Sequence, residues 1–232
     1  MLPAERKIPS EMSRDGPSDS TPQSLVEAAL RLFGLKGYDA TSIREIASEA
    51  KANVASIGYH FGGKDGLRRA CAEQVAATIR VFANAAFVEG LDPSKLTPAE
   101  ARERLHGFVA RVVPFVLTDK RARLMMHFMI REMANPSIAI DIVYGGVVEP
   151  THRRICALWA AVTGEEAESE TVRLAVFGVV GQVFYFRFAQ EIVVRRMAWK
   201  EYGAREALAI ASEISGLMDS ALDRHIAART GK

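Results

Sequence analysis

Two stretches of the chain decide its fold: GYDATSIREIA at residues 37–47 and YHFGGKDGL at residues 59–67. In the first stretch, Ser42 is followed three residues later by Glu45, the spacing of a capping box at the start of a helix. Thr41 is the rival cap residue at the same place. Isoleucine and alanine then recur at helical spacing, so this stretch predicts a helix over residues 42–50.

A very short helix follows a break in the chain at residues 51–53. Asn53 is a good N-cap for it, and Gly62-Gly63 ends it near Phe61, before another helix begins at Lys64 or Asp65. An amphipathic helix over residues 22–36 precedes both stretches. Short helices with a tight turn between the second and the third have the geometry of a helix-turn-helix DNA-binding unit.

The rest of the chain also has helical periodicity, and no segment alternates strictly between apolar and polar residues. We expect helices over residues 98–118, 120–134, 137–162, 166–196 and 204–228, which makes an all-α protein of about nine helices. Gly145-Gly146 and Pro150 lie inside one of these ranges and predict a kink there, or two helices in place of one. Residues 1–21 are rich in serine, proline and charge and are expected to be a disordered arm.

Composition excludes several classes of protein. The chain has 232 residues with a net charge of +2, which rules out a polybasic or strongly acidic tail. No apolar run reaches the roughly 18 residues of a membrane-spanning helix, and the N-terminus has no apolar signal core. We therefore expect no membrane partner. Cys71 and Cys156 are too few and too far apart for a disulfide framework, which fits a reducing cytoplasm.

No catalytic or metal-binding pattern is complete. Gly58, Gly63 and Lys64 match the start of a phosphate loop, but Asp65 stands where a hydroxyl should bind magnesium, and no strand precedes them. His152 and Cys156 lie one helical turn apart without a third ligand nearby in the sequence. The sequence therefore predicts no enzyme, no cofactor and no metal.

Residues 37–47 and 59–67 resemble the TetR family of bacterial transcription regulators. Asn135-Pro136-Ser137, Val148-Glu149-Pro150 and the run from Gly181 to Arg187 are similar to the CecR-like branch of that family. The resemblance implies a homodimer that binds a palindromic operator in double-stranded DNA, with repression relieved by a small apolar or amphipathic effector. It implies three regions: an arm at 1–21, a helix-turn-helix domain at 22–70, and a ligand-binding and dimerisation domain at 71–232.

The resemblance assigns the DNA contacts residue by residue. Thr41, Ser42, Tyr59 and Lys64 match positions that usually hold phosphates, and Arg44 and residues 53–56 match positions that usually face bases. Arg44 also lies where its helix begins, and the helix dipole favours a phosphate there. The residues carried over, or placed there by their outward position on the third helix, are Thr41, Ser42, Arg44, Asn53, Val54, Ala55, Ser56, Tyr59, His60 and Lys64. Two positions depart from the family pattern: Lys51 stands where glycine is common, and Gly58 where tyrosine is common. These departures leave open an alternative, a helical ligand-binding dimer that has lost specific DNA binding.

The C-terminal helices carry aromatic and methionine residues that suit a ligand pocket, although ordinary core packing explains the same pattern. The candidates for the pocket are Phe108, Val112, Phe115, Met125, Phe128, Met129, Tyr144, Trp159, Gln182 and Tyr185. Apolar stripes in the last two predicted helices suit a subunit interface or closure of the subunit core. The candidates for the interface are Phe177, Gly181, Phe184, Phe188, Ile210, Ile214, Leu217 and Ala221.

Overall fold

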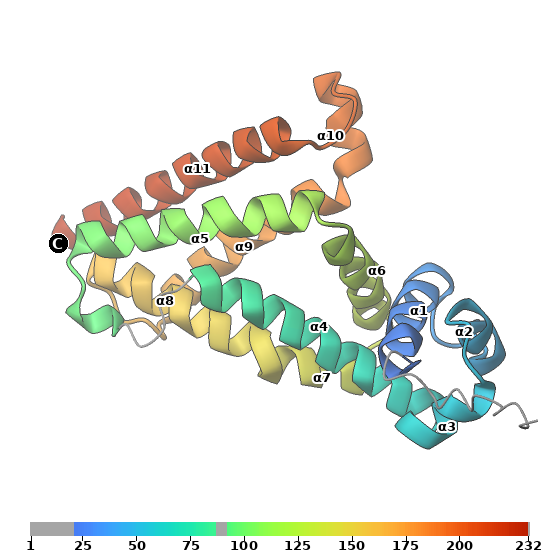
Figure 1. Cartoon of the computed structure of the whole chain (residues 1–232). Coiled ribbons are helices and arrows are strands. Elements are labelled where there is room, and N and C mark those ends of the chain that lie inside the picture. Colours follow the sequence, from blue (N-terminus) through green and yellow to red (C-terminus); the bar gives the residue numbers. More distant parts are fainter. Residues whose placement is uncertain (1–20, 87–91, 232) are drawn as a thin grey trace, which may run out of the picture.

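The computed structural model describes residues 21–86 and 92–231, and every regular element in these ranges is helical, which confirms the all-α prediction (Figure 1). The first helices are α1 (Thr21–Lys36), α2 (Ile43–Glu49), α3 (Val54–Phe61) and α4 (Lys64–Ala86). A short 3₁₀ turn (Pro93–Lys95) precedes the others: α5 (Pro98–Thr118), α6 (Lys120–Ala134), α7 (Ile138–Val143), α8 (Glu149–Thr163), α9 (Glu170–Phe188), α10 (Gln190–Met197) and α11 (Ala204–Thr230). The arm predicted at residues 1–21 lies outside the described residues, except for Thr21, which begins α1.

Local hydrogen bonds explain where the small helices begin. The Ser42 hydroxyl accepts from the Glu45 amide at 3.2 Å, and the Glu45 carboxylate accepts from the Ser42 amide at 2.8 Å. Ser42 is therefore the cap of α2, and Thr41 is not. The Asn53 side chain accepts from the Ala55 amide at 2.9 Å and caps α3 as expected.

The range 137–162 forms two helices, one of the two outcomes predicted there. A π-helical turn (Tyr144–Val148) joins α7 to α8. Pro150 has no amide hydrogen to donate to the Gly146 carbonyl. That carbonyl instead accepts from the Arg80 guanidinium of α4 at 3.0 and 3.2 Å, so the irregular turn is tied to the long helix beside it.

The single helix predicted over residues 166–196 is wrong, because α9 ends at Phe188 and α10 begins at Gln190. No proline or glycine marks this break. The Tyr202 hydroxyl donates to the Phe186 carbonyl at 3.1 Å, which occupies an acceptor that a continuing helix would use itself. A tertiary contact therefore accompanies the end of α9 at a place where local sequence favours helix.

The buried apolar residues form two clusters. The first joins α1, α2, α3 and α4 to α6 and α7, and includes Phe33, Ile57 and Phe128. The second joins α5, α8, α9 and α11, and includes Leu105, Trp159 and Ile214. The helix-turn-helix region thus shares its core with two later helices, which fixes its position on the rest of the molecule.

Candidate nucleic-acid interface

The outer face of α3 is open to solvent. Val54, Ala55 and Tyr59 are exposed, with Tyr59 at 85%, and a Cβ added at Gly58 would meet no atom within 4 Å. Ile57 is fully buried on the opposite side. A helix with its inner side packed and a free outer side can enter a DNA major groove.

Three cations in this region are exposed and form no ion pair with any described residue: Arg44, Lys51 and Arg69. Others are neutralised. The Arg31 guanidinium lies 2.6 Å from the Glu49 carboxylate, and other acidic residues pair with Lys36 and Arg68. The unpaired positive charge is therefore concentrated on few side chains, which suits phosphate binding by placement rather than by net charge.

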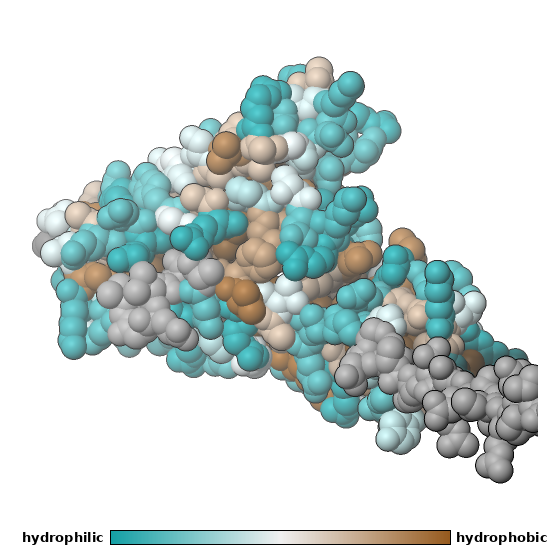
Figure 2. Space-filling model, viewed as in Figure 1, coloured by the Kyte–Doolittle hydropathy of each residue, from teal (hydrophilic) through white to brown (hydrophobic). Residues whose placement is uncertain are grey.

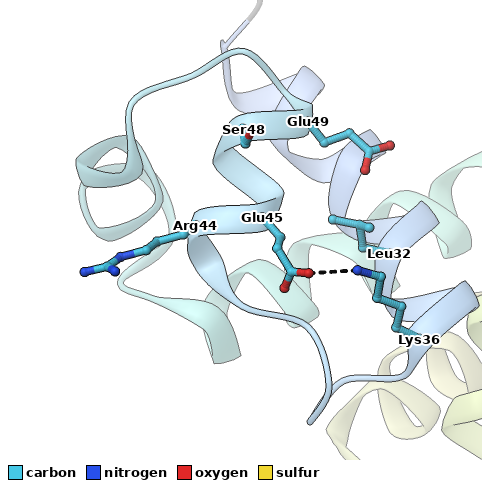
Figure 3. A pocket seen from close by; sticks show the side chains of 6 residues that line it. All are labelled: Leu32, Lys36, Arg44, Glu45, Ser48 and Glu49. Carbon is cyan, nitrogen blue, oxygen red and sulfur yellow. Dashed lines mark hydrogen bonds and ion pairs between the residues drawn. The ribbon is translucent and has the colours of Figure 1, made fainter.

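Figure 3 shows a hollow between α1 and α2, lined by Leu32, Lys36, Arg44, Glu45, Ser48 and Glu49. The Lys36 ammonium lies 2.7 Å from the Glu45 carboxylate, and this contact together with the Ser42 bonds lowers the pKa of Glu45 to about 2. Arg44 points away from the ion pair (Figure 3). Within the hollow, the charges of Lys36 and Glu45 neutralise one another. The cation that forms no ion pair with a described residue, Arg44, faces outward.

Thr41 requires a correction, because it is only 1% exposed. Its hydroxyl donates to the carbonyl of Gly37 at 2.7 Å and approaches that of Leu32 at 3.3 Å. The side chain therefore fixes the turn between α1 and α2 and does not present a hydroxyl to a phosphate. A small hydroxyl side chain at this position suits a phosphate contact, which is why the sequence suggested one. The burial of Thr41 shows that its hydroxyl instead stabilises the fold.

The turn between α2 and α3 forms a Schellman motif at the position where the family favours glycine. The Ala52 amide donates to the Ala47 carbonyl at 2.9 Å, and the Lys51 amide donates to the Ser48 carbonyl at 3.2 Å. Lys51 has φ of +54°, in the left-handed region that L-residues rarely adopt. The departure from the family pattern thus places strain in the turn and leaves its hydrogen bonds intact.

Tyr38 contacts three side chains near the start of α4, and the sequence did not predict these contacts. Its hydroxyl donates to Asp65, and its ring lies under the Lys64 ammonium (4.1 Å to the ring centroid) and the Arg68 guanidinium (4.3 Å). Burial and the Asp65 bond raise the pKa of Tyr38 to about 12. Lys64 is half-buried, held over this ring at the first position of α4. An aromatic residue 26 positions before a lysine gives no local signal of this contact.

The remaining predicted contacts lie at the ends of α2 and α3. Ser42 and Asn53 are exposed, and both side chains cap helices. Ser56 is half-buried, and the exposed His60 ring stacks edge-on against Tyr59 with centroids 4.9 Å apart. Their assignment to DNA stays a prediction.

A buried ion pair joins this region to the C-terminal helices. Arg68 of α4 donates to both carboxylate oxygens of Glu132 in α6, at 2.9 and 2.7 Å, and the Glu132 side chain is 2% exposed. Ser137 at the start of α7 also donates to Glu132. Close packing adds to the link, because a Cβ at Gly34 of α1 would lie 3.0 Å from the His127 Cβ of α6. Movement of α6 would therefore reach α1 and α4 directly.

The ten pocket candidates are spread over different parts of the fold, and their assignment to a ligand pocket stays a prediction. Phe115, Met125, Phe128 and Met129 belong to the first core cluster or pack against it, whereas Phe108, Val112 and Trp159 belong with the second. Tyr144 and Tyr185 are 51% and 57% exposed. Helical periodicity predicts which face of a helix is apolar, but it does not predict which helices pack against that face.

Some buried polar atoms in the C-terminal helices have no hydrogen-bond partner in the part of the chain that the structure describes: His152 Nε2, Trp159 Nε1 and Gln182 Oε1. Unpaired buried polar atoms are uncommon in native proteins. The His152 Nδ1 lies 3.5 Å from the Cys156 Sγ, and within residues 21–86 and 92–231 no cluster of three metal-ligating side chains includes them. Gln182 therefore remains a candidate for a ligand contact.

The predicted interface residues divide between surface and core. Phe177, Gly181, Phe184 and Phe188 are exposed along α9, and Leu217 is exposed on α11. Ala221 is half-buried. Ile210 and Ile214 are 3% and 0% exposed within the second cluster, so they face the subunit core and their assignment to an interface is wrong.

Helix α9 leaves an apolar face uncovered within the subunit, with Leu174, Phe177 and Phe184 among its exposed side chains. By length and composition it is the one helix of the described residues that meets the criterion for a membrane span, although no apolar run was long enough to suggest this in the sequence. Only 22% of that apolar window is buried within the subunit. An apolar face of this extent on a helical bundle marks a surface that another element covers.

Comparisons with known proteins match both halves of the chain. The tetR family of bacterial regulatory proteins matches residues 25–71, and the C-terminal domain of the HTH-type transcriptional dual regulator CecR matches residues 101–224. CecR of Shigella flexneri is 31% identical over 182 residues, which cover 78% of this chain and 81% of CecR. The regulatory protein RaaS of Mycobacterium tuberculosis is 41% identical over 68 residues, which cover 29% of this chain and 31% of RaaS.

Solved structures share the fold at lower identity. A protein from Pseudomonas aeruginosa PAO1, described as a transcriptional regulator, superposes with a TM-score of 0.65 at 17% identity. The match covers 91% of this chain and 96% of that protein. The fold resemblance therefore extends from the helix-turn-helix region through the C-terminal helices.

Proposed function

The chain belongs to the TetR family of transcription regulators and carries a C-terminal domain of the CecR type, and we propose that it is a dimeric, sequence-specific repressor. Members of this family are DNA-binding proteins and not enzymes. Residues 22–70 would read the operator, and residues 71–232 would bind an effector and the second subunit.

The observation that carries the DNA-binding proposal is the open face of α3 beside unpaired cations. Val54 and Ala55 would approach base edges, and Tyr59, Arg44 and Lys51 would approach phosphates. Ser42, Asn53, Ser56, His60 and Lys64 complete the proposed contact surface. Thr41 would act indirectly, because its buried hydroxyl holds the turn from which α2 begins.

The exposed face of α9 supports the dimer. Phe177, Phe184 and Phe188 leave apolar surface uncovered, and Gly181 allows the backbone of another helix to come close. A second copy presenting the same face would cover this surface about a two-fold axis. The two α3 helices would then need to lie about one turn of DNA apart, near 34–36 Å, or a multiple of that distance.

Effector control is supported by the connection between α6 and the DNA-binding helices. The Arg68–Glu132 pair and the Gly34–His127 contact join α6 to α4 and α1. In Figure 2, apolar atoms gather over the middle of the molecule near α5 and the adjoining part of α4, between hydrophilic side chains. A ligand that binds there and favours one position of α6 would shift the spacing of the two α3 helices.

Selection of bound DNA from a random pool, with purified full-length protein at two salt concentrations, tests the proposal. A palindrome whose half-sites lie one helical turn apart, or a multiple, is the expected result. Sequence-independent, salt-sensitive binding would contradict it and would favour the alternative of a ligand-binding dimer without operator specificity.

Arginine variants make this test specific to the proposed surface. Arg44→Gln should lower affinity for the selected operator and reduce the slope of log K against log salt by about 0.9 for each phosphate that the variant no longer binds. Arg31→Gln is the matched control, because it removes the same charge from a side chain that already pairs with Glu49. Equal losses of affinity in the two variants would show a general charge effect and remove Arg44 from the contact surface.

A further inference from the structure

Arg187 is a half-buried cation near the end of α9 without an acidic partner among the described residues. Its Nη1 donates to the Gln190 side-chain oxygen at 2.7 Å and lies 3.4 Å from the Leu117 carbonyl. Both acceptors are neutral. A guanidinium has five donors, so the two contacts leave most of its hydrogen-bonding capacity and all of its charge unmatched.

Two further basic side chains lie on α6, which begins just after Leu117. Arg123 and His127 are four residues apart and share a face of that helix. Neither side chain has a hydrogen bond or ion pair with any residue that the structure describes. The carboxylate at the start of α6, Asp119, is already bound to the Arg121 amide at 2.7 Å and guanidinium at 2.9 Å.

The three basic groups affect one another electrostatically. Burial lowers the pKa of His127, and the charges of Arg187 and Arg123 lower it further. Burial and the charge of Arg123 likewise lower the pKa of Arg187. Like charges repel one another and together attract an anion, so the junction of α5, α6 and α9 has the electrostatics of an anion-binding site.

Apolar and polar groups that suit the rest of a small molecule lie on the same helices. Phe115, one turn before Asp119 in α5, stacks on Phe82 of α4 with ring centroids 3.6 Å apart, and both rings are half-buried. On α9, the side-chain oxygen of Gln182 is buried without a partner among the described residues. A ligand here would meet aromatic surface beside a concentrated positive charge.

We infer that Arg123, His127 and Arg187 bind the acidic head group of an amphipathic ligand whose apolar tail lies toward Phe82 and Phe115. The ligand class is a carboxylate or a phosphate monoester with a single alkyl or aryl tail. Arginine matches either head group with two parallel hydrogen bonds. This inference rests on the proposed effector-binding role of the C-terminal helices and names the chemistry that such an effector would carry.

Calorimetric titration of the full-length protein with octanoate, octyl phosphate, octan-1-ol and inorganic phosphate tests this assignment. The two octyl acids should bind at least tenfold more tightly than octanol, which has the tail alone, and than phosphate, which has a head group alone. Removing one charge-assisted hydrogen bond costs about 1.5–3 kcal/mol, so Arg187→Gln should weaken the preferred acid about 10- to 100-fold. Its binding of octanol should not change.

Arg195→Gln is the matched control. It removes the same charge from α10, where the Arg195 guanidinium is exposed and bound to Glu191 at 2.8 Å. Arg123→Gln provides a second test, because the Arg123 side chain is exposed and its replacement disturbs no buried contact of the described residues. Acid binding that falls in both site variants and is unchanged in Arg195→Gln supports the inference.

Equal affinity for octanol and the acids, or equal losses of acid affinity in Arg123→Gln and Arg195→Gln, would overturn the inference. Phosphate binding as tight as octyl phosphate would overturn the role of the tail. Each variant is also assayed with the operator recovered by DNA selection. Operator binding that survives while the head-group preference is absent rejects the acid site alone and leaves the DNA-binding proposal standing.

Discussion

Replacing Lys51 with glycine tests the strain in the turn between α2 and α3. Lys51 holds φ of +54° there, and a left-handed conformation costs an L-residue roughly 1–2 kcal/mol. Glycine removes this cost, but its freedom in the unfolded chain offsets about 0.5–1 kcal/mol of the gain. We therefore expect Lys51→Gly to raise the free energy of unfolding by about 1 kcal/mol, a Tm increase of about 2–4 °C for a chain of this size.

Ala198 provides a matched control for the backbone. It also has φ of +54°, at the end of α10, and Figure 1 shows α10 well separated from α2 and α3. Ala198→Gly should therefore give a similar gain in thermal and denaturant unfolding without changing DNA binding. Lys51→Gln separates charge from conformation, because it removes the ammonium and keeps the strained backbone.

The DNA measurement distinguishes the two roles of Lys51. If its exposed side chain contacts a phosphate, both Lys51→Gly and Lys51→Gln should reduce the salt slope of operator binding by about 0.9 per subunit. Only Lys51→Gly should stabilise the fold. The expected glycine variant is thus a more stable protein that binds DNA less tightly.

Three outcomes would each contradict one of these expectations. A Tm that rises for Ala198→Gly and not for Lys51→Gly would show that the turn at Lys51 is not strained by its side chain. Equal stabilisation by Lys51→Gln and Lys51→Gly would assign the effect to charge repulsion. A salt slope unchanged in both variants would remove Lys51 from the proposed DNA contacts.

Three further substitutions have defined expected outcomes. Gly58→Ala should stabilise α3 by about 0.8–1.0 kcal/mol, because alanine is the better helix former and the added Cβ meets no neighbour; chemical denaturation that shows no gain would contradict this. Gly66→Ala should destabilise the fold by more than about 1 kcal/mol, as overpacked side chains do, because the added Cβ would lie 1.6 Å from the Phe61 carbonyl oxygen. A Tm equal to that of the wild type would contradict this close approach. Arg68→Ala should lower the free energy of unfolding by about 3–5 kcal/mol, because it leaves Glu132 charged and buried without its partner. Adding Glu132→Leu to this variant should recover part of the loss. A double variant no more stable than Arg68→Ala alone would contradict this explanation.

Local signals predicted the helix-turn-helix region closely. The Ser42 and Asn53 caps act over two or three residues, so the sequence contains the whole interaction. Pro150 likewise marked the interruption between α7 and α8. The end of α9 was missed, because the hydroxyl that bonds to the Phe186 carbonyl comes from Tyr202, in a different element.

The candidate site was harder to predict, because residue type alone does not report burial. Thr41 and Ser42 are adjacent small hydroxyl residues, yet the first is 1% exposed and the second is open to solvent. In the same way, Ile214 and Leu217 lie in one apolar stripe of α11, but only Leu217 is on the surface. These outcomes depend on which helix packs against which, and no pattern within a single helix specifies that arrangement.

The core that α1, α2 and α3 share with α6 and α7 limits how this protein can be recombined. A chimera that joins residues 22–70 to an unrelated sensor would expose Phe33 and separate it from the residues around Phe128. Conversely, a foreign DNA-binding segment placed on this sensor would have to match the surface that α6 presents. Exchange of operator specificity is therefore better made by grafting only the outward side chains of α3, which leaves Ile57 and the common core in place.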